Sequence, residues 1–72
     1  MFLPLHVILI VIYNGHSQES AITIVGSIAD AIDTAIEGER VRRFRAVRIM
    51  GSNGIVLMDE ARLRVEIDTN RS

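Results

Sequence analysis

The stretch from Gly38 to Asp68 decides the fold and reads GERVRRFRAVRIM, then GSNG, then IVLMDEARLRVEID. In its last part, apolar residues at positions 57, 61, 63, 65 and 67 alternate with other residues that are mostly charged. A period of two is typical of a strand with one buried and one solvated face. Asn53-Gly54 is a strong hairpin signal, because a type I′ turn needs positive φ at both central residues. The stretch predicts a hairpin turning at 51–54, with four inward residues: Ala61, Leu63, Val65 and Ile67.

The turn leaves two registers open for this hairpin. A two-residue turn at Asn53-Gly54 gives Asp59, the one polar residue on the apolar side, an arginine partner in Arg48. A four-residue turn would shift the pairing by two and place Arg45 opposite Glu60 instead. We favour the first register because it pairs Asp59.

The size and composition of the chain predict a single domain, residues 1–72, that associates with itself. A chain of 72 residues buries a modest share of its surface and is marginally stable alone. It contains no cysteine that could form a disulfide, yet 49% of its residues are hydrophobic. One helix and one hairpin cannot hide that much aliphatic surface. We therefore expect a homo-oligomer.

The charges of the chain are nearly balanced but unevenly distributed. The net charge is −1, so the whole chain has no overall attraction to nucleic acid. All of the basic residues are arginines, and five of them fall between Arg40 and Arg48, just downstream of a group of acidic residues. We favour charge pairing within and between subunits. The alternative is an anionic-ligand or RNA-binding module that uses the Arg40–Arg48 strand.

Residues 5–13, LHVILIVIY, form a β-branched run that predicts a strand with both faces covered. The run is far shorter than a membrane span and lacks the basic flank and small-residue cleavage site of a secretory signal. We therefore expect no membrane partner and a cytoplasmic protein.

Residues 20–37 predict an amphipathic helix. An apolar stripe lies opposite a row of polar residues that recur three or four positions apart. The polar residues are Ser20, Thr23, Ser27, Asp30, Thr34 and Glu37. Ser17 is suited to cap the start of this helix, and Gly38 to end it. The expected order is β-α-β-β, with the first two strands parallel and the third between them. This is an α+β fold, a three-stranded antiparallel-type sheet wrapped around one helix.

The sequence offers no catalytic or metal-binding constellation, and we expect a protein that is not an enzyme. His16 and Ser17 are adjacent, and neighbours in sequence rarely point at each other; Ser17 is also the expected cap. Two histidines are too few for a metal site, and Asp59 and Glu60 would point to opposite faces of a strand.

The order of elements and three segments together resemble the dodecins, small β-α-β-β proteins that form hollow twelve-subunit shells and bind flavins. The segments are VIYNGHSQES at 11–20, VRRFRAV at 41–47 and ARLRVEI at 61–67. The resemblance covers nearly the whole chain. It implies a homo-oligomer of twelve subunits, a dodecamer that forms a hollow shell and binds or stores flavin.

The resemblance also implies a site for flavin (FMN, riboflavin or FAD), with Phe44 and Glu60 as its residues. Flavin-binding dodecins stack the ring on a tryptophan, where this chain has Phe44, and meet its polar edge with a glutamine, where it has Glu60. A phenyl ring offers less stacking area, and an ionised carboxylate can only accept hydrogen bonds. Phe44 could equally be a core residue that packs on Leu63.

These observations predict a non-enzymatic, dodecin-like, shell-forming protein that binds or stores a small planar ligand, with flavin as the first candidate. A structural cage without flavin is the alternative from a different class. The arginine-rich module described above is the third.

Overall fold

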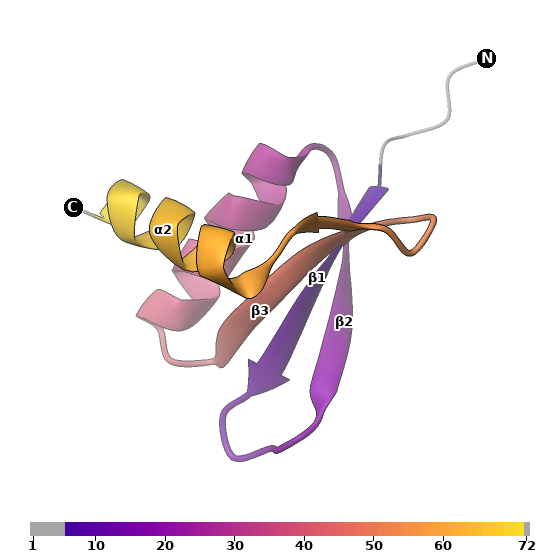
Figure 1. Ribbon diagram of the computed structural model, residues 1–72. Helices are drawn as coiled ribbons and strands as arrows, with labels where there is room; N and C mark the ends of the chain where they lie inside the picture. The colour runs from indigo at the N-terminus through magenta and orange to yellow at the C-terminus, as the bar shows by residue number, and fades with distance from the viewer. Residues whose placement is uncertain (1–5, 72) are drawn as a thin grey trace.

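The computed structural model describes residues 6–71. Their order is β1 (His6–Tyr13), β2 (Glu19–Val25), α1 (Ile28–Arg40), β3 (Phe44–Gly51), β4 (Val56–Met58) and α2 (Glu60–Arg71). The strands form one sheet in the order β2-β1-β3-β4, and all neighbouring strands are antiparallel. Both helices lie on the same side of this sheet (Figure 1). The α+β class is confirmed, but the described residues form four strands and two helices rather than three strands and one helix.

The helix expected over 20–37 is wrong in its first third, which forms β2. The segment Ile22-Thr23-Ile24-Val25 is β-branched throughout and therefore favours a strand. Gly26, at φ 143, then breaks the strand in a conformation that side chains rarely adopt. Ser27, rather than Ser17, caps α1 in a capping box with Asp30, whose carboxylate accepts a hydrogen bond from the Ser27 backbone N–H at 2.8 Å.

The extra strand changes the sheet topology that the sequence predicts. β1 and β2 form an antiparallel hairpin, so the first two strands are not parallel. β1 also pairs antiparallel with β3 and is therefore an inner strand, whereas the inner position was expected for the last strand. The strand expected over residues 5–13 is confirmed over His6–Tyr13 as β1, whereas Leu5 lies outside the described residues.

The strand expected after Asp59 is wrong, because the chain forms α2 there. Asp59 accepts a hydrogen bond from the backbone N–H of Arg62 at 2.9 Å, which satisfies a donor in the first helical turn. Leu63 and Ile67, four residues apart, are fully buried, whereas Val65 is 58% exposed. A helical period therefore replaces the period of two, and of the four predicted inward residues only Leu63 and Ile67 are buried.

The turn at 51–54 is confirmed, and the favoured register holds at one pair only. The Gly54 N–H donates to the Gly51 carbonyl at 3.0 Å, and Met58 lies opposite Ile49, as that register requires. A register shift next to this pair places Val56 opposite Met50. β4 ends at Met58, so Asp59 has no place opposite Arg48 in a ladder.

The core lies between the sheet and the two helices. Every described element except the short β4 and the edge strand β2 contributes fully buried side chains, which include Leu9, Val11, Ala31, Ala35, Ile49, Leu63 and Ile67. Ile22, Ile24 and Met58 pack against this cluster from the two outer strands. Alternate residues of β1 and β2 thus point towards the helices, and the others point to the opposite side. In β3 this alternation is interrupted at Val47, the extra residue of a bulge opposite β1.

Helix α1 passes through Gly38, its expected end, and finishes at Arg40. Gly38 is buried, and a Cβ atom there would overlap the ring of Phe44. The Arg43 N–H donates to the Gly38 carbonyl at 2.8 Å and the Arg42 N–H to the Glu39 carbonyl at 3.1 Å, a Schellman motif. Its left-handed position, usually glycine, is Arg42 at φ 59, which costs roughly 1 kcal/mol relative to glycine.

Candidate functional site

The side of the sheet opposite the helices is the most distinctive surface of the protein. We call it the open face, and it consists of outward residues of all four strands: His6, Ile8, Ile10, Ile12, Glu19, Ala21, Thr23, Val25, Arg45, Arg48, Met50 and Val56. Their shared orientation follows from the register, in which Ile8 lies opposite Thr23 and Met50, and Ile10 opposite Ala21 and Arg48. None of them belongs to the buried core or packs against it. The expectation that both faces of β1 are covered is therefore wrong within this chain.

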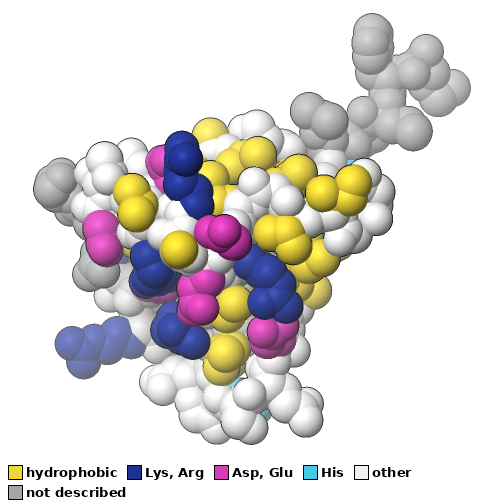
Figure 2. Space-filling view, in the orientation of Figure 1, with side chains coloured by type: hydrophobic (Ala, Val, Ile, Leu, Met, Phe, Trp, Pro, Cys, Tyr) yellow, Lys and Arg dark blue, Asp and Glu magenta, His cyan; other side chains and the backbone are white. Residues whose placement is uncertain are grey.

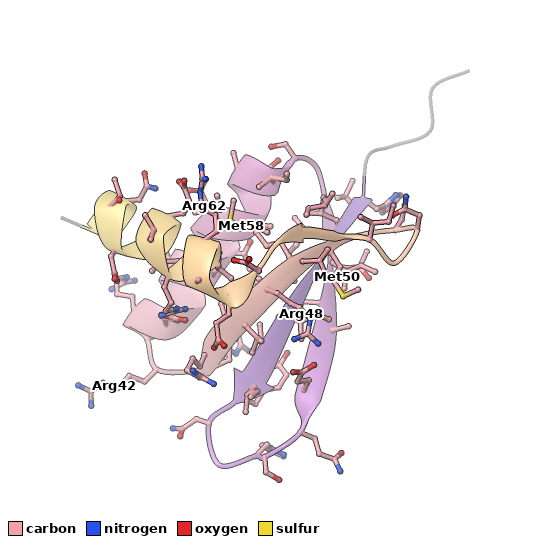
Figure 3. The ribbon with its side chains drawn as sticks, viewed as in Figure 1. Arg42, Arg48, Met50, Met58 and Arg62 are labelled. Carbon is pink, nitrogen blue, oxygen red and sulfur yellow. The ribbon has the colours of Figure 1, made fainter. Side chains whose placement is uncertain are left out.

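The open face is largely apolar. The three isoleucines of β1 run along its middle and are only half-buried, while Val25 is 67% and Val56 is 49% exposed. Figure 3 shows Met50 and Arg48 extending from β3 towards β2, and Met58 on the side of α2. Figure 2 shows hydrophobic side chains along the upper right of its view, with acidic and basic side chains gathered nearer the middle and left.

The charged groups of the open face are paired within the chain. Arg48 of β3 donates to both carboxylate oxygens of Glu19 of β2, with Nη2 2.5 Å from Oε1. Arg45 donates to Glu60 at 3.1 Å. The Arg45–Glu60 pair is the one that the second register implied, although Glu60 provides it from the start of α2 rather than from a strand. The face therefore carries no unpaired carboxylate or guanidinium within the described residues.

Charge pairing also accounts for most of the arginine-rich segment. Arg40 pairs with Glu37 at 2.6 Å, and this hydrogen bond lowers the pKa of the exposed Glu37 carboxyl. With the pairs of Arg45 and Arg48, three of the five arginines between positions 40 and 48 have carboxylate partners. The expected pairing within the chain is confirmed for these three, which leaves Arg42 and Arg43 as the cations of the segment without a described ion pair.

A second charged group joins α1, α2 and β3. The guanidinium of Arg64 donates to both carboxylate oxygens of Glu39 and, at 3.1 Å, to the carbonyl of Ala46. Glu39 also accepts the N–H of Ala46 at 2.8 Å, and its side chain is only 10% exposed. The hydrogen bonds with Glu39 raise the pKa of Arg64. Arg64 Nε is the one buried side-chain nitrogen or oxygen without a hydrogen-bond partner in the described part of the chain.

The two residues expected to hold a flavin, Phe44 and Glu60, occupy different environments. Phe44 is 7% exposed; its ring lies over Gly38 and makes an edge-to-face contact with Tyr13, with centroids 5.9 Å apart. Glu60 is exposed at the start of α2 and binds Arg45. Phe44 is thus a core residue in the single chain: it belongs to the same buried cluster as Leu63, and its ring also contacts Tyr13.

A cavity of about 640 Å³ lies at the end of the sheet where β1 turns into β2. We call it the turn pocket. One side is formed by the β1–β2 turn and the other by the end of α1, the start of β3 and one residue of α2; its lining includes Tyr13, Asn14, His16, Glu39, Arg42, Phe44, Arg45 and Arg64. His16 lines this pocket, but no hydrogen bond between His16 and Ser17 is present.

The open face does not follow from the sequence prediction, in which Ser20–Val25 belong to a helix. The alternation of Ala21, Thr23 and Val25 with Ser20, Ile22 and Ile24 was the available signal, since the two sets point to opposite sides of the sheet.

Within residues 6–71, no helix is long and apolar enough to cross a membrane. The same residues contain no group of three histidine or carboxylate side chains placed to hold a metal ion.

Comparisons with models of protein families, with curated proteins and with solved structures gave no match to this chain.

Proposed function

We propose that this protein is a non-enzymatic, self-associating structural protein whose subunits join through their open faces. The observation that carries the proposal is a four-stranded sheet with helices on one side only and aliphatic residues along the other. In domains of this kind, the apolar side of a sheet is normally buried against another layer. A second copy of the same sheet would supply that layer.

The charges on the open face favour a second copy of this chain as the partner. Glu19 and Arg48 neutralise each other, and Glu60 neutralises Arg45. Two such faces can therefore meet around a twofold axis without placing an uncompensated charge at the interface. Sheets that pack in this way lie about 10 Å apart with interdigitated side chains.

The size of the face indicates a moderate affinity. At about 4.8 Å per strand and 3.3 Å per residue, the three longer strands and the three-residue β4 cover roughly 400 Å² in projection. This is within the range of the largest apolar patches on monomers, about 300–600 Å², and below the roughly 800 Å² per partner of a standard interface. We therefore expect an association that depends on protein concentration.

Sedimentation velocity over a series of concentrations tests the proposal. Ile10→Lys places a charge at the centre of the open face, between Ala21 and Arg48. Val65→Lys is the matched control, because Val65 is an exposed apolar residue on α2 outside the face. We expect oligomers of the natural chain and of Val65→Lys, and monomers of Ile10→Lys. A natural chain that is monomeric throughout, or equal effects of the two substitutions, would overturn the proposal.

The resemblance to the dodecins would extend this association to a closed shell of twelve subunits with bound flavin. Both remain predictions, and the β-β-α-β-β-α order of this chain differs from the β-α-β-β order that the resemblance implies. Native mass distinguishes a dodecamer from a dimer. Quenching of riboflavin fluorescence by the natural chain, lost in a Phe44→Leu variant that keeps its fold, would support a flavin site.

A further inference from the structure

We infer that the turn pocket binds a small organic phosphate, with its phosphoryl group held by Arg42, Arg45 and Arg64. This inference does not rest on the proposed self-association, although Arg45 belongs to both the open face and the turn pocket. It rests on the arrangement of charge in the pocket, on an unpartnered nitrogen and on the conformation of one arginine.

The residues that line the turn pocket carry more positive than negative charge. Three of its lining residues are arginines, and the only carboxylate among them is Glu39. Glu60, which does not line the pocket, pairs with Arg45, and Glu39, which does, pairs with Arg64. Guanidinium groups held in this way lose little freedom when they bind an anion, and their planar fork matches the oxygens of a phosphate.

Arg64 contributes a second, independent indication. Its Nε is buried and has no hydrogen-bond partner, although the other nitrogens of the same guanidinium are bound to Glu39 and Ala46. A buried donor without an acceptor is unusual in a native structure and needs an explanation. Because Arg64 lines the turn pocket, an oxyanion bound beside it would offer the acceptor that Nε lacks.

Arg42 provides a third indication that the turn pocket binds a phosphate. It occupies the left-handed position of the Schellman motif, where glycine is the normal residue, and its guanidinium has no ion-pair partner among the described residues. Figure 3 shows its side chain extending outward from the α1–β3 turn, so Arg42 would have to swing back over the turn pocket that it lines in order to reach a bound phosphate. Strained positions of this kind cluster at ligand-binding sites. A cation interacts favourably with the dipole of α1 from any position near the end of the helix. The helix dipole alone therefore does not explain why an arginine occupies the strained position 42.

The dimensions and the walls of the pocket indicate the class of ligand. A volume of about 640 Å³ suits a nucleotide-sized molecule. Tyr13 and Phe44 provide an aromatic wall, and Asn14 provides an amide beside it. We therefore commit to a mononucleotide-like phosphate. A long RNA is disfavoured because the chain has a net charge of −1 and most of its other described arginines are already paired.

Titration calorimetry with AMP, pyrophosphate and adenosine tests this inference. We expect AMP and pyrophosphate to bind, adenosine to bind at least tenfold more weakly, and added salt to weaken the binding of both phosphates. The fluorescence of Tyr13, the single tyrosine of the chain, should change on addition of pyrophosphate.

Two variants assign the binding to the pocket. Arg42→Gly should weaken AMP binding about tenfold while raising the melting temperature, a combination that simple unfolding cannot produce. Arg62→Gln, which removes one exposed arginine of α2 outside the pocket, should leave binding unchanged. Absence of binding by the natural chain, an equal loss in the two variants, or tight binding of single-stranded RNA without binding of AMP would overturn the inference.

Discussion

Arg48 and Glu19 form an ion pair that spans the central strand of the sheet. Arg48 lies on β3 and Glu19 on β2, and the pair crosses β1 beside Ile10 and Ile12 with Nη2 2.5 Å from Oε1. Two charges on an otherwise apolar surface thereby cancel each other, which makes the open face suitable for contact with a second copy.

We expect Glu19→Gln to weaken self-association more than it weakens the fold. Both side chains are partly exposed in the single chain, so the pair contributes only about 0–1 kcal/mol to folding. In the proposed dimer, however, the variant would bury an unpaired Arg48 guanidinium. Urea denaturation measures the first effect and the concentration dependence of sedimentation the second. Loss of folding stability with unchanged association would contradict this prediction.

We expect Gly38→Ala to destabilise the protein. In an exposed helix interior, this change adds stability of up to about 1 kcal/mol. Here the new methyl group would overlap the Phe44 ring, and overpacking a core typically costs about 1–3 kcal/mol. Thermal denaturation gives the sign directly. An increase in melting temperature would mean that Phe44 does not lie over α1.

We expect Glu39→Gln to lower the free energy of unfolding by about 2–3 kcal/mol, because it leaves the guanidinium of Arg64 without its carboxylate partner. The matched control is Glu66→Gln, which breaks the exposed pair with Arg62 and should cost less than about 1 kcal/mol. Urea denaturation compares the two. Equal losses would show that the Glu39 pair is no more important than a surface pair.

We expect Arg42→Gly to raise the free energy of unfolding by about 1 kcal/mol, because glycine adopts the left-handed conformation without strain. Arg40→Gly, two residues earlier and inside α1, should instead lower it by about 1 kcal/mol. Thermal denaturation of both variants tests the Schellman motif. A loss of stability in both would place the end of α1 elsewhere.

The sequence was sufficient to predict the elements that have a single consistent pattern. β1 is an unbroken β-branched run, and the Gly54 turn has a strong local signal, so both were predicted correctly. The segments 20–25 and 60–67 fit the periods of both a strand and a helix. Local contacts decide between the two: Gly26 ends β2, Ser27 begins α1 and Asp59 begins α2.

The candidate sites were harder to predict because they combine distant parts of the chain. The open face needs β2 as a strand, and the turn pocket unites the β1–β2 turn with α1, β3 and α2. Arg45–Glu60 was foreseen as one of two registers, whereas Arg48–Glu19 joins residues 29 positions apart and depends on a strand that was not expected. The high content of aliphatic residues did predict that some apolar surface would remain exposed in a single chain. The open face is that surface.

The central claim is that two copies meet through their open faces, and isotope-filtered NMR tests it most directly. A mixture of subunits labelled with ¹³C on isoleucine methyl groups and unlabelled subunits reports only contacts between subunits. We predict inter-subunit NOEs from Ile8, Ile10 and Ile12, and none from Ile49, which is fully buried on the helix side. Oligomers that lack NOEs from the three β1 isoleucines would contradict the account.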